Sequence, residues 1–233
     1  MGYIVGDIHT IIKTLPSNSV DFIYTDPPFG ITNADWDVGL DWMSLWDDMW
    51  RVLKPKGTIC LYASMPFTYE LLRYQKPKYH YTWIKDNTTG FLTAKTQPLR
   101  QCEEIFIYYK RPPTYNPQML GDDVRTTSVN DHTGGSGYYK NKNKSKRTVS
   151  DYEGETEHHG AYPTTCFHSP IRRDGTGISR TDDHIDRFIK TYTNLGETVL
   201  DMTCHNYTVG NRCKALGRRY IGIDLKCPST ASD

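Results

Sequence analysis

Long apolar runs, closely spaced cysteine pairs and a surplus of one charge sign are all missing from this sequence of 233 residues. No stretch approaches the roughly 20 apolar residues of a membrane helix, and residues 1–5 lead into a strand pattern instead of a signal peptide. The six cysteines are scattered, which excludes a disulfide framework of the secreted type. We therefore expect a reduced, intracellular (cytoplasmic) protein without a membrane partner.

Three common kinds of site lack the residues that they require. No cysteine or histidine pair with zinc-ligand spacing is joined to a second such pair, so we expect no metal site. The glycine-rich residues 134–137 are not followed by Gly-Lys-Ser/Thr, which favours a hinge over a phosphate-binding loop, and no local motif indicates a serine nucleophile. The cysteines and histidines considered are His158, His159, Cys166, His168, Cys204, His205 and Cys213.

The net charge of +1 does not by itself indicate a nucleic-acid partner, but the charge is unevenly distributed. Five cations fall within one eight-residue stretch, which could follow a phosphate backbone or form a solvated loop. Lys95 and Arg100, between two expected strands, are further cations of this kind. The five are Lys140, Lys142, Lys144, Lys146 and Arg147.

The first 110 or so residues alternate between strand and helix patterns, and the last 50 or so do so again. Continuous apolar runs predict strands buried on both faces, as in a mostly parallel α/β sheet with helices on both faces. Residues 111–173 differ, being rich in Pro, Gly, Asn, Thr, Tyr and charge, and predict an insertion without regular structure. We expect strands at 3–6, 21–25, 58–62, 79–84, 104–109, 198–201 and 220–224, and helices at 8–15, 41–53, 182–191 and 211–216.

Four of the expected strands end in an aspartate: Asp7, Asp26, Asp201 and Asp224. Open α/β sheets bind ligands outside the carboxyl ends of their strands, so four carboxylates would lie along one rim. An acid at a strand end often takes ribose hydroxyls in nucleotide-binding folds, and Asp224 is a candidate for that role. The alternative at each position is an ordinary helix cap.

The segment Asp26-Pro27-Pro28-Phe29 carries the most specific chemistry. Because proline has no N–H, the rigid turn leaves the Pro27 carbonyl available to accept a hydrogen bond, and Asp26 supplies a second acceptor. Phe29 offers an apolar face that could stack on a nucleobase. Two acceptors and a ring suit an amino group on an unstacked base, although such a turn can also be only a turn.

Taken together, the motifs resemble those of the amino-group DNA methyltransferases of the beta arrangement, in which the catalytic motif precedes the S-adenosylmethionine motif. The resemblance implies a Rossmann-like methyltransferase fold, with core parts at 1–110 and 176–233 and an inserted target-recognition region at 111–175. It covers nearly the whole chain in the family's order. The matching segments are 25–30, 83–85 with 90–91, 98–105, 113–118, 162–165, 189–194 with 196–201, and 216–224.

The resemblance also implies roles for individual residues. Asp26 and the Pro27 carbonyl would hold the target amino group, while Phe29, next to Pro28, would stack on the flipped base. Asp224 would take the ribose of S-adenosylmethionine, Asp201 would lie near its methionine end, and Asp7, with Ile8, near its adenine. The loop expected to line this cofactor comprises Thr203, His205, Asn206, Tyr207 and Thr208.

Two segments depart from the family pattern. The usual Gly-Ser-Gly-Thr turn after Asp201 is replaced by residues 203–208. Asn206 tolerates left-handed backbone, whereas His205 and Tyr207 add bulk where the carboxylate end of the cofactor is expected. The usual His-Pro-Thr-Gln-Lys-Pro segment is replaced by residues 176–181. There Arg180 could supply the cation, and Ser179 a hydrogen bond, for the cofactor carboxylate.

The resemblance implies a site-specific enzyme that methylates the N6 amino group of adenine in double-stranded DNA, because the family writes Asp for adenine and Ser for cytosine at position 26. Cytosine-N4 methylation, RNA methylation and a DNA-binding protein with impaired cofactor binding remain alternatives. Lys95, Arg100 and the five clustered cations would contact DNA. A homodimer and a companion restriction endonuclease are further partners that the family makes possible.

Overall fold

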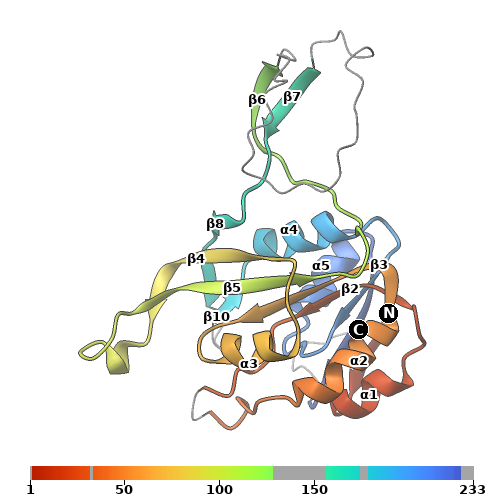
Figure 1. Cartoon of the computed structure of the whole chain (residues 1–233), viewed down its shortest axis with the longest axis vertical. Helices are drawn as coiled ribbons and strands as arrows, with labels where there is room; N and C mark the ends of the chain where they lie inside the picture. The colour runs from red at the N-terminus through yellow and green to blue at the C-terminus, as the bar shows by residue number, and fades with distance from the viewer. Residues whose placement is uncertain (1, 32–33, 128–155, 174–177, 227–233) are drawn as a thin grey trace. The chain divides into compact units, whose positions relative to one another are not determined.

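The computed structural model describes residues 2–31, 34–127, 156–173 and 178–226 (Figure 1). Its contacts divide the chain into two compact units. The larger comprises Met1–Asn116 with Thr164–Asp233, and the smaller is Pro117–Pro163. The boundaries differ from the predicted insertion at 111–175, because residues on both of its flanks pack with the larger unit.

The larger unit is built on an eight-stranded sheet. Neighbouring strands run parallel except at β5, which is antiparallel to both β3 and β4. The mostly parallel sheet predicted from the continuous apolar runs is therefore confirmed. In spatial order the strands are β1 (Gly2–Val5), β12 (Arg219–Asp224), β11 (Thr198–Asp201), β2 (Val20–Thr25), β3 (Leu53–Ala63), β5 (Arg100–Tyr108), β4 (Tyr79–Thr89) and β8 (Cys166–His168).

Helices cover both faces of this sheet and bury two separate apolar clusters. On one face lie α1 (Ile8–Thr14), α2 (Trp42–Val52) and α3 (Phe67–Tyr74), and on the other lie α4 (Asp182–Tyr192) and α5 (Thr208–Ala215) (Figure 1). Within the described ranges, no helix is both long enough and apolar enough to cross a membrane.

Helix α2 shows how the local sequence sets one of these elements. It begins where the Asp41 carboxylate accepts a hydrogen bond from the Met43 amide at 3.1 Å, which caps the first turn. Its buried side chains recur every three or four residues and form the apolar stripe that faces the sheet. The apolar spacing of Trp42, Leu45, Trp46, Met49, Trp50 and Leu53 predicted a core-facing stripe, which is confirmed except that Trp50 is only partly buried. The stripe consists of Trp42, Leu45, Trp46, Met49 and Val52.

The prediction that residues 111–173 lack regular structure is wrong. This stretch contains β6 (Leu120–Thr127), β7 (Thr156–Ala161), β8 and β9 (Ile171–Arg173), the last paired with β10 (Ile178–Arg180). These strands are short and polar, so their pairing partners rather than an apolar pattern define them. Helix α3, which is only eight residues long, was also not predicted. The five clustered cations and residues 134–137 lie outside the described residues.

The strand register places the predicted aspartates along one edge of the sheet. Asp224 lies opposite Val5, two residues before Asp7, and Asp201 lies opposite Tyr24, two residues before Asp26. Because these strands are parallel, their carboxyl ends meet at the same rim. The expectation that four carboxylates share that rim is confirmed.

Candidate active site

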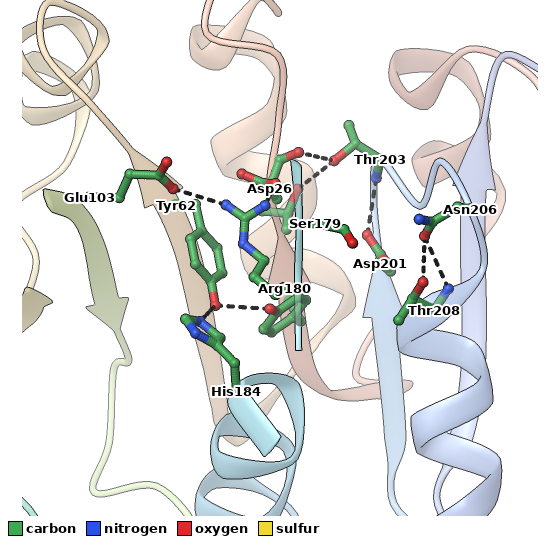
Figure 2. A network of polar contacts seen from close by, with 12 residues as sticks. Asp26, Tyr62, Glu103, Ser179, Arg180, His184, Asp201, Thr203, Asn206 and Thr208 are labelled. Atoms are coloured by element: carbon green, nitrogen blue, oxygen red, sulfur yellow. Dashed lines mark hydrogen bonds and ion pairs between the residues drawn. The ribbon is translucent and has the colours of Figure 1, made fainter. Parts of the chain in front are cut away.

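Four side chains of alternating charge are linked in a row from Asp26 to Lys85, and Figure 2 shows the first three, Asp26, Arg180 and Glu103. Asp26 follows β2, and its Oδ2 pairs with Nη1 of Arg180 from β10. The second nitrogen, Nη2 of Arg180, donates to Oε2 of Glu103 at 3.1 Å. On the far side, Oε1 of Glu103 accepts from Nζ of Lys85 at 2.9 Å. Strands β2, β10, β5 and β4 thus place a cation between two carboxylates.

Arg180 is held in place by aromatic side chains as well as by these acids. Its guanidinium carbon lies 4.1 Å from the ring centroid of Tyr62 and 5.3 Å from that of Trp83. Only 13% of the Arg180 side chain is exposed. The Tyr62 hydroxyl is itself fixed 2.7 Å from His184 Nε2 and 2.8 Å from the Tyr24 hydroxyl. These contacts fix the plane of the guanidinium against Asp26.

This environment differs from the one expected for Arg180 and Ser179. Both Nη atoms of Arg180 are engaged by protein carboxylates, so the side chain is not the free cation anticipated for a cofactor carboxylate. Ser179 Oγ lies 3.5 Å from the carbonyl of Arg172, in the β9–β10 pair. The Nε of Arg180 is buried without a hydrogen-bond partner in the described part of the chain.

The electrostatic environment raises the pKa of two rim carboxyls. Burial raises the pKa of Asp26 to about 6, opposed by the Arg180 cation and reinforced by the Glu103 carboxylate. Its side chain is still 32% exposed, so it can be reached from solution. Burial raises the pKa of Asp201 to about 7, opposed by hydrogen bonds from the Thr203 amide and the Tyr220 hydroxyl. Both groups therefore change charge close to neutral pH.

Thr203 ties the Asp26 motif to the loop that follows β11. Its Oγ1 donates to the backbone carbonyl of Asp26 at 3.1 Å and lies 3.2 Å from the Thr25 hydroxyl. Its amide donates to Oδ1 of Asp201 at 3.3 Å. The two segments predicted to hold base and cofactor are thus joined directly through one side chain.

The loop without glycine adopts the backbone that glycine would favour. His205 and Tyr207 have φ values of 39° and 61°, in the left-handed region. Asn206, the residue expected to tolerate such backbone, does not have a positive φ. The Asn206 side chain instead accepts hydrogen bonds from the amide and hydroxyl of Thr208, at 3.3 and 2.7 Å, at the start of α5. The His205 amide donates to Oδ2 of Asp224 at 2.8 Å, which orients that carboxylate.

The Tyr207 ring packs against neighbouring side chains of the protein. Its ring packs edge-on against Tyr220 with centroids 5.2 Å apart, and against Gly210, where an added Cβ would lie 2.8 Å from the Tyr207 ring. The ring therefore lies against the second apolar cluster.

Glycine at each of these two positions should have opposite effects on stability. His205 is exposed, so His205→Gly relieves left-handed strain of about 1 kcal/mol and should leave the free energy of unfolding unchanged or slightly higher. Tyr207→Gly loses the ring packing and should lower the free energy of unfolding by about 2–4 kcal/mol. Urea unfolding of both variants, with His205→Ala as the control that keeps the strain, measures the difference. Equal losses in the two glycine variants would contradict it.

Several other predicted residues take structural contacts. Asp7 caps α1, with Oδ1 accepting from the His9 and Thr10 amides at 2.9 and 3.3 Å, and Ile8 is core. The alternative of a helix cap therefore holds at Asp7. Phe29 is partly buried, and its ring stacks on Phe67 with centroids 5.3 Å apart.

Some residues that shape the site were missed. Asp37 accepts hydrogen bonds from the Gly30 and Ile31 amides at 2.8 and 3.0 Å and holds the turn after Phe29. Glu103 and Lys85 lie in matched motifs, yet nothing in the spacing indicated that they meet. Lys95, in the segment that joins β4 to β5, and Arg100, the first residue of β5, are both exposed. In the described ranges, no group of three or more His, Cys, Asp or Glu side chains could hold a metal.

A mostly parallel sheet flanked by helices, with an Asp-Pro-Pro-Phe turn on its acidic rim, places this chain among the α/β proteins that bind ligands at the carboxyl ends of their strands. The family model described as DNA methylase, of the N6 and N4 type, matches residues 20–227, and the chain belongs to this family. Three curated relatives are similar to it. Type II methyltransferase M.BamHI of Bacillus amyloliquefaciens is 28% identical over 94% of the chain, type II methyltransferase M.HpaI of Haemophilus parainfluenzae 24% over 92%, and DNA adenine methyltransferase YhdJ of Escherichia coli K12 26% over 94%.

The chain is shorter than each of these relatives. It spans 53% of M.BamHI, 67% of M.HpaI and 76% of YhdJ. Among solved structures, PvuII DNA methyltransferase (cytosine-N4-specific) matches with a TM-score of 0.65 at 14% identity, over 97% of this chain and 82% of that one. M1.HpyAVI matches with a TM-score of 0.58 at 17% identity, over 96% and 91%. These likenesses confirm the Rossmann-like methyltransferase fold.

Proposed function

We propose that this chain transfers a methyl group from S-adenosylmethionine to the N6 amino group of adenine in double-stranded DNA. The observation that carries the proposal is the direct link, through Thr203, between the Asp26 turn and the rim that holds Asp201 and Asp224. A base held at the turn and a methyl donor held on the rim would then be neighbours. Membership of the DNA methylase family and the name of the YhdJ relative support it.

The described residues suit this cofactor. Asp224, oriented by the His205 amide, can accept hydrogen bonds from ribose hydroxyls. Burial raises the pKa of the Asp201 carboxyl, so a nearby cationic amine would stabilise its charged form. When bound, S-adenosylmethionine supplies a methyl group on a positively charged sulfur.

The protein groups act by positioning and hydrogen bonding. In the proposed mechanism the Asp26 carboxylate accepts one N–H of the adenine amino group, and the Pro27 carbonyl accepts the other. These bonds direct the nitrogen lone pair away from the ring and toward the methyl group. Arg180 keeps Asp26 ionised and orients its free oxygen. Positioning would then favour direct transfer without a covalent intermediate, in which the N–C bond forms as the S–C bond breaks to leave a neutral thioether, and the Asp26 carboxylate would pass the surplus amino proton to solvent.

Calorimetric titration with S-adenosylmethionine should show saturable binding in the micromolar range, about −8 kcal/mol. Asp224→Asn should weaken it about tenfold or more, since the ribose loses a charged acceptor. The matched control, Asp48→Asn, changes an aspartate on α2 that pairs with Arg51 in a partly buried position, and it should bind as the wild type does. If the folded wild type does not bind, with or without DNA, the proposal fails in favour of a DNA-binding scaffold.

The methylated base separates adenine from cytosine chemistry. Aspartate instead of serine at position 26 favours adenine. Genomic DNA treated with the protein and digested to nucleosides should contain N6-methyladenine by mass spectrometry. Finding N4-methylcytosine instead would show that the protein methylates cytosine. If total RNA treated in parallel gave the only methylated product, the proposal of a DNA substrate would be wrong.

A further inference from the structure

The ribbon formed by β4 and β5 ends in two exposed apolar side chains. Phe91 is 69% exposed and Leu92 is fully exposed, at 104%. Figure 1 shows the two strands extending beyond the rest of the sheet, with this tip at the left. Exposing two adjacent large apolar residues has an unfavourable solvation cost, so such a display points to a binding surface.

The tip is ordered by its own hydrogen bonds. Gly90 adopts φ 93°, and the 3₁₀ turn η1 (Phe91–Thr93) follows it. The Ala94 amide donates to the Phe91 carbonyl at 3.2 Å, and Gln97 Nε2 donates to Thr93 Oγ1 at 2.8 Å. The two apolar side chains are therefore presented from a preorganised turn, which reduces the entropy lost on binding.

The charge around this tip favours an anionic partner. Residues 87–102 contain no aspartate or glutamate, whereas Lys95 and Arg100 are both exposed. The nearest acid on the β4 side, Asp86, accepts a hydrogen bond from the Ile171 amide at 3.0 Å. An apolar pair flanked by cations matches the stacked bases and phosphates of a nucleic acid.

The base of the same ribbon is part of the candidate active site. Lys85 in β4 and Glu103 in β5 connect through Arg180 to Asp26. Phe91 lies six positions after Lys85, a span of up to about 20 Å at ~3.3 Å per residue. That reach exceeds the ~12 Å width of the DNA major groove. The tip can therefore meet the duplex from which a target base is taken.

We propose that Phe91 and Leu92 insert between base pairs of duplex DNA beside the target base, while Lys95 and Arg100 bind the flanking phosphates. The inference rests on the proposed function. Extruding a base removes its stacking, and an inserted apolar wedge replaces part of that contact.

A relaxed plasmid provides the test without knowledge of the target sequence. The full chain is bound to it, topoisomerase I is added, and the change in linking number is measured after protein removal. Wild-type protein should unwind the plasmid. The double variant Phe91→Ala/Leu92→Ala should bind with an unchanged salt dependence but lose most of the unwinding, and single-turnover methylation should fall roughly tenfold. Lys95→Gln/Arg100→Gln should instead reduce the slope of log affinity against log salt by roughly 1.8.

Leu195→Ala, which shortens another exposed apolar side chain (77% exposed), is the matched control and should behave as the wild type. Unchanged unwinding and methylation in the Phe91/Leu92 variant would overturn the wedge while leaving the proposed function intact. If the only effect of the Phe91/Leu92 variant were a change from dimer to monomer in light scattering, the tip would be a contact between two copies of the chain. That result would also overturn the wedge. Wild-type protein that neither binds nor methylates DNA would instead defeat the proposed function itself.

Discussion

Replacing Asp26 by alanine should reduce methyl transfer by at least ~100-fold, because the amino group loses the acceptor that directs its lone pair. Asp26→Asn should be nearly as severe, since an amide is a weaker acceptor and presents N–H groups of its own. Transfer of tritiated methyl groups to genomic DNA under single-turnover conditions measures the loss.

The Asp26 variants should remain folded. Burial raises the pKa of this carboxyl to about 6, so its charged form destabilises the native state relative to the neutral form. The protonated Asp26 carboxyl therefore stabilises the folded wild type at low pH, and this contribution is lost as the pH rises through about 6. The melting temperature of Asp26→Ala relative to wild type should therefore improve as the pH increases. Glu103 still pairs with Arg180 in this variant.

Asp48→Ala serves as the matched control for loss of an aspartate. Asp48 pairs with Arg51 at 3.1 Å on α2, and only 17% of its side chain is exposed, so its removal should cost about 1–3 kcal/mol of stability. Its methylation rate should equal that of the wild type. Activity retained in a folded Asp26→Ala protein would contradict the assignment of this residue.

Replacing Arg180 by glutamine should shift the acidic limb of the rate–pH profile upward. The wild-type rate should fall as the pH decreases through about 6, where Asp26 takes up a proton. Arg180 lowers that pKa, so without the cation Asp26 stays protonated to higher pH. The rate of Arg180→Gln should therefore be lowest relative to wild type near neutrality and should recover partly in alkaline buffer. Arg180→Lys keeps the charge and should restore most of the profile.

Glu103→Gln provides a test of opposite sign. The Glu103 carboxylate raises the pKa of Asp26, so its neutral analogue should move the acidic limb to lower pH. Melting curves verify that both variants are folded, because Lys85 loses a charged partner in one of them. A uniform loss of rate in Arg180→Gln, with no displacement of the limb, would reduce Arg180 to a structural role.

Local sequence was sufficient for the frame of this protein. The apolar runs that end in Asp26, Asp201 and Asp224 predicted parallel strands, and the register places those acids on one rim. The stripe of α2 predicted its buried face. These features depend on periodicity and strand ends, which are properties of neighbouring residues.

Tertiary structure decided which charged groups meet. Arg180 follows Asp26 by 154 positions, and only the pairing of β9 with β10 and the packing on Tyr62 direct it to Asp26 and Glu103. The family resemblance had suggested that Arg180 could supply the cation for the cofactor carboxylate, because it lies in the segment that replaces the family's lysine-containing motif. Likewise, His205 and Tyr207 take left-handed backbone because the loop must connect β11 to α5 while its amides reach Asp224. Pairing across the sheet is a long-range choice, and residue types alone do not fix it.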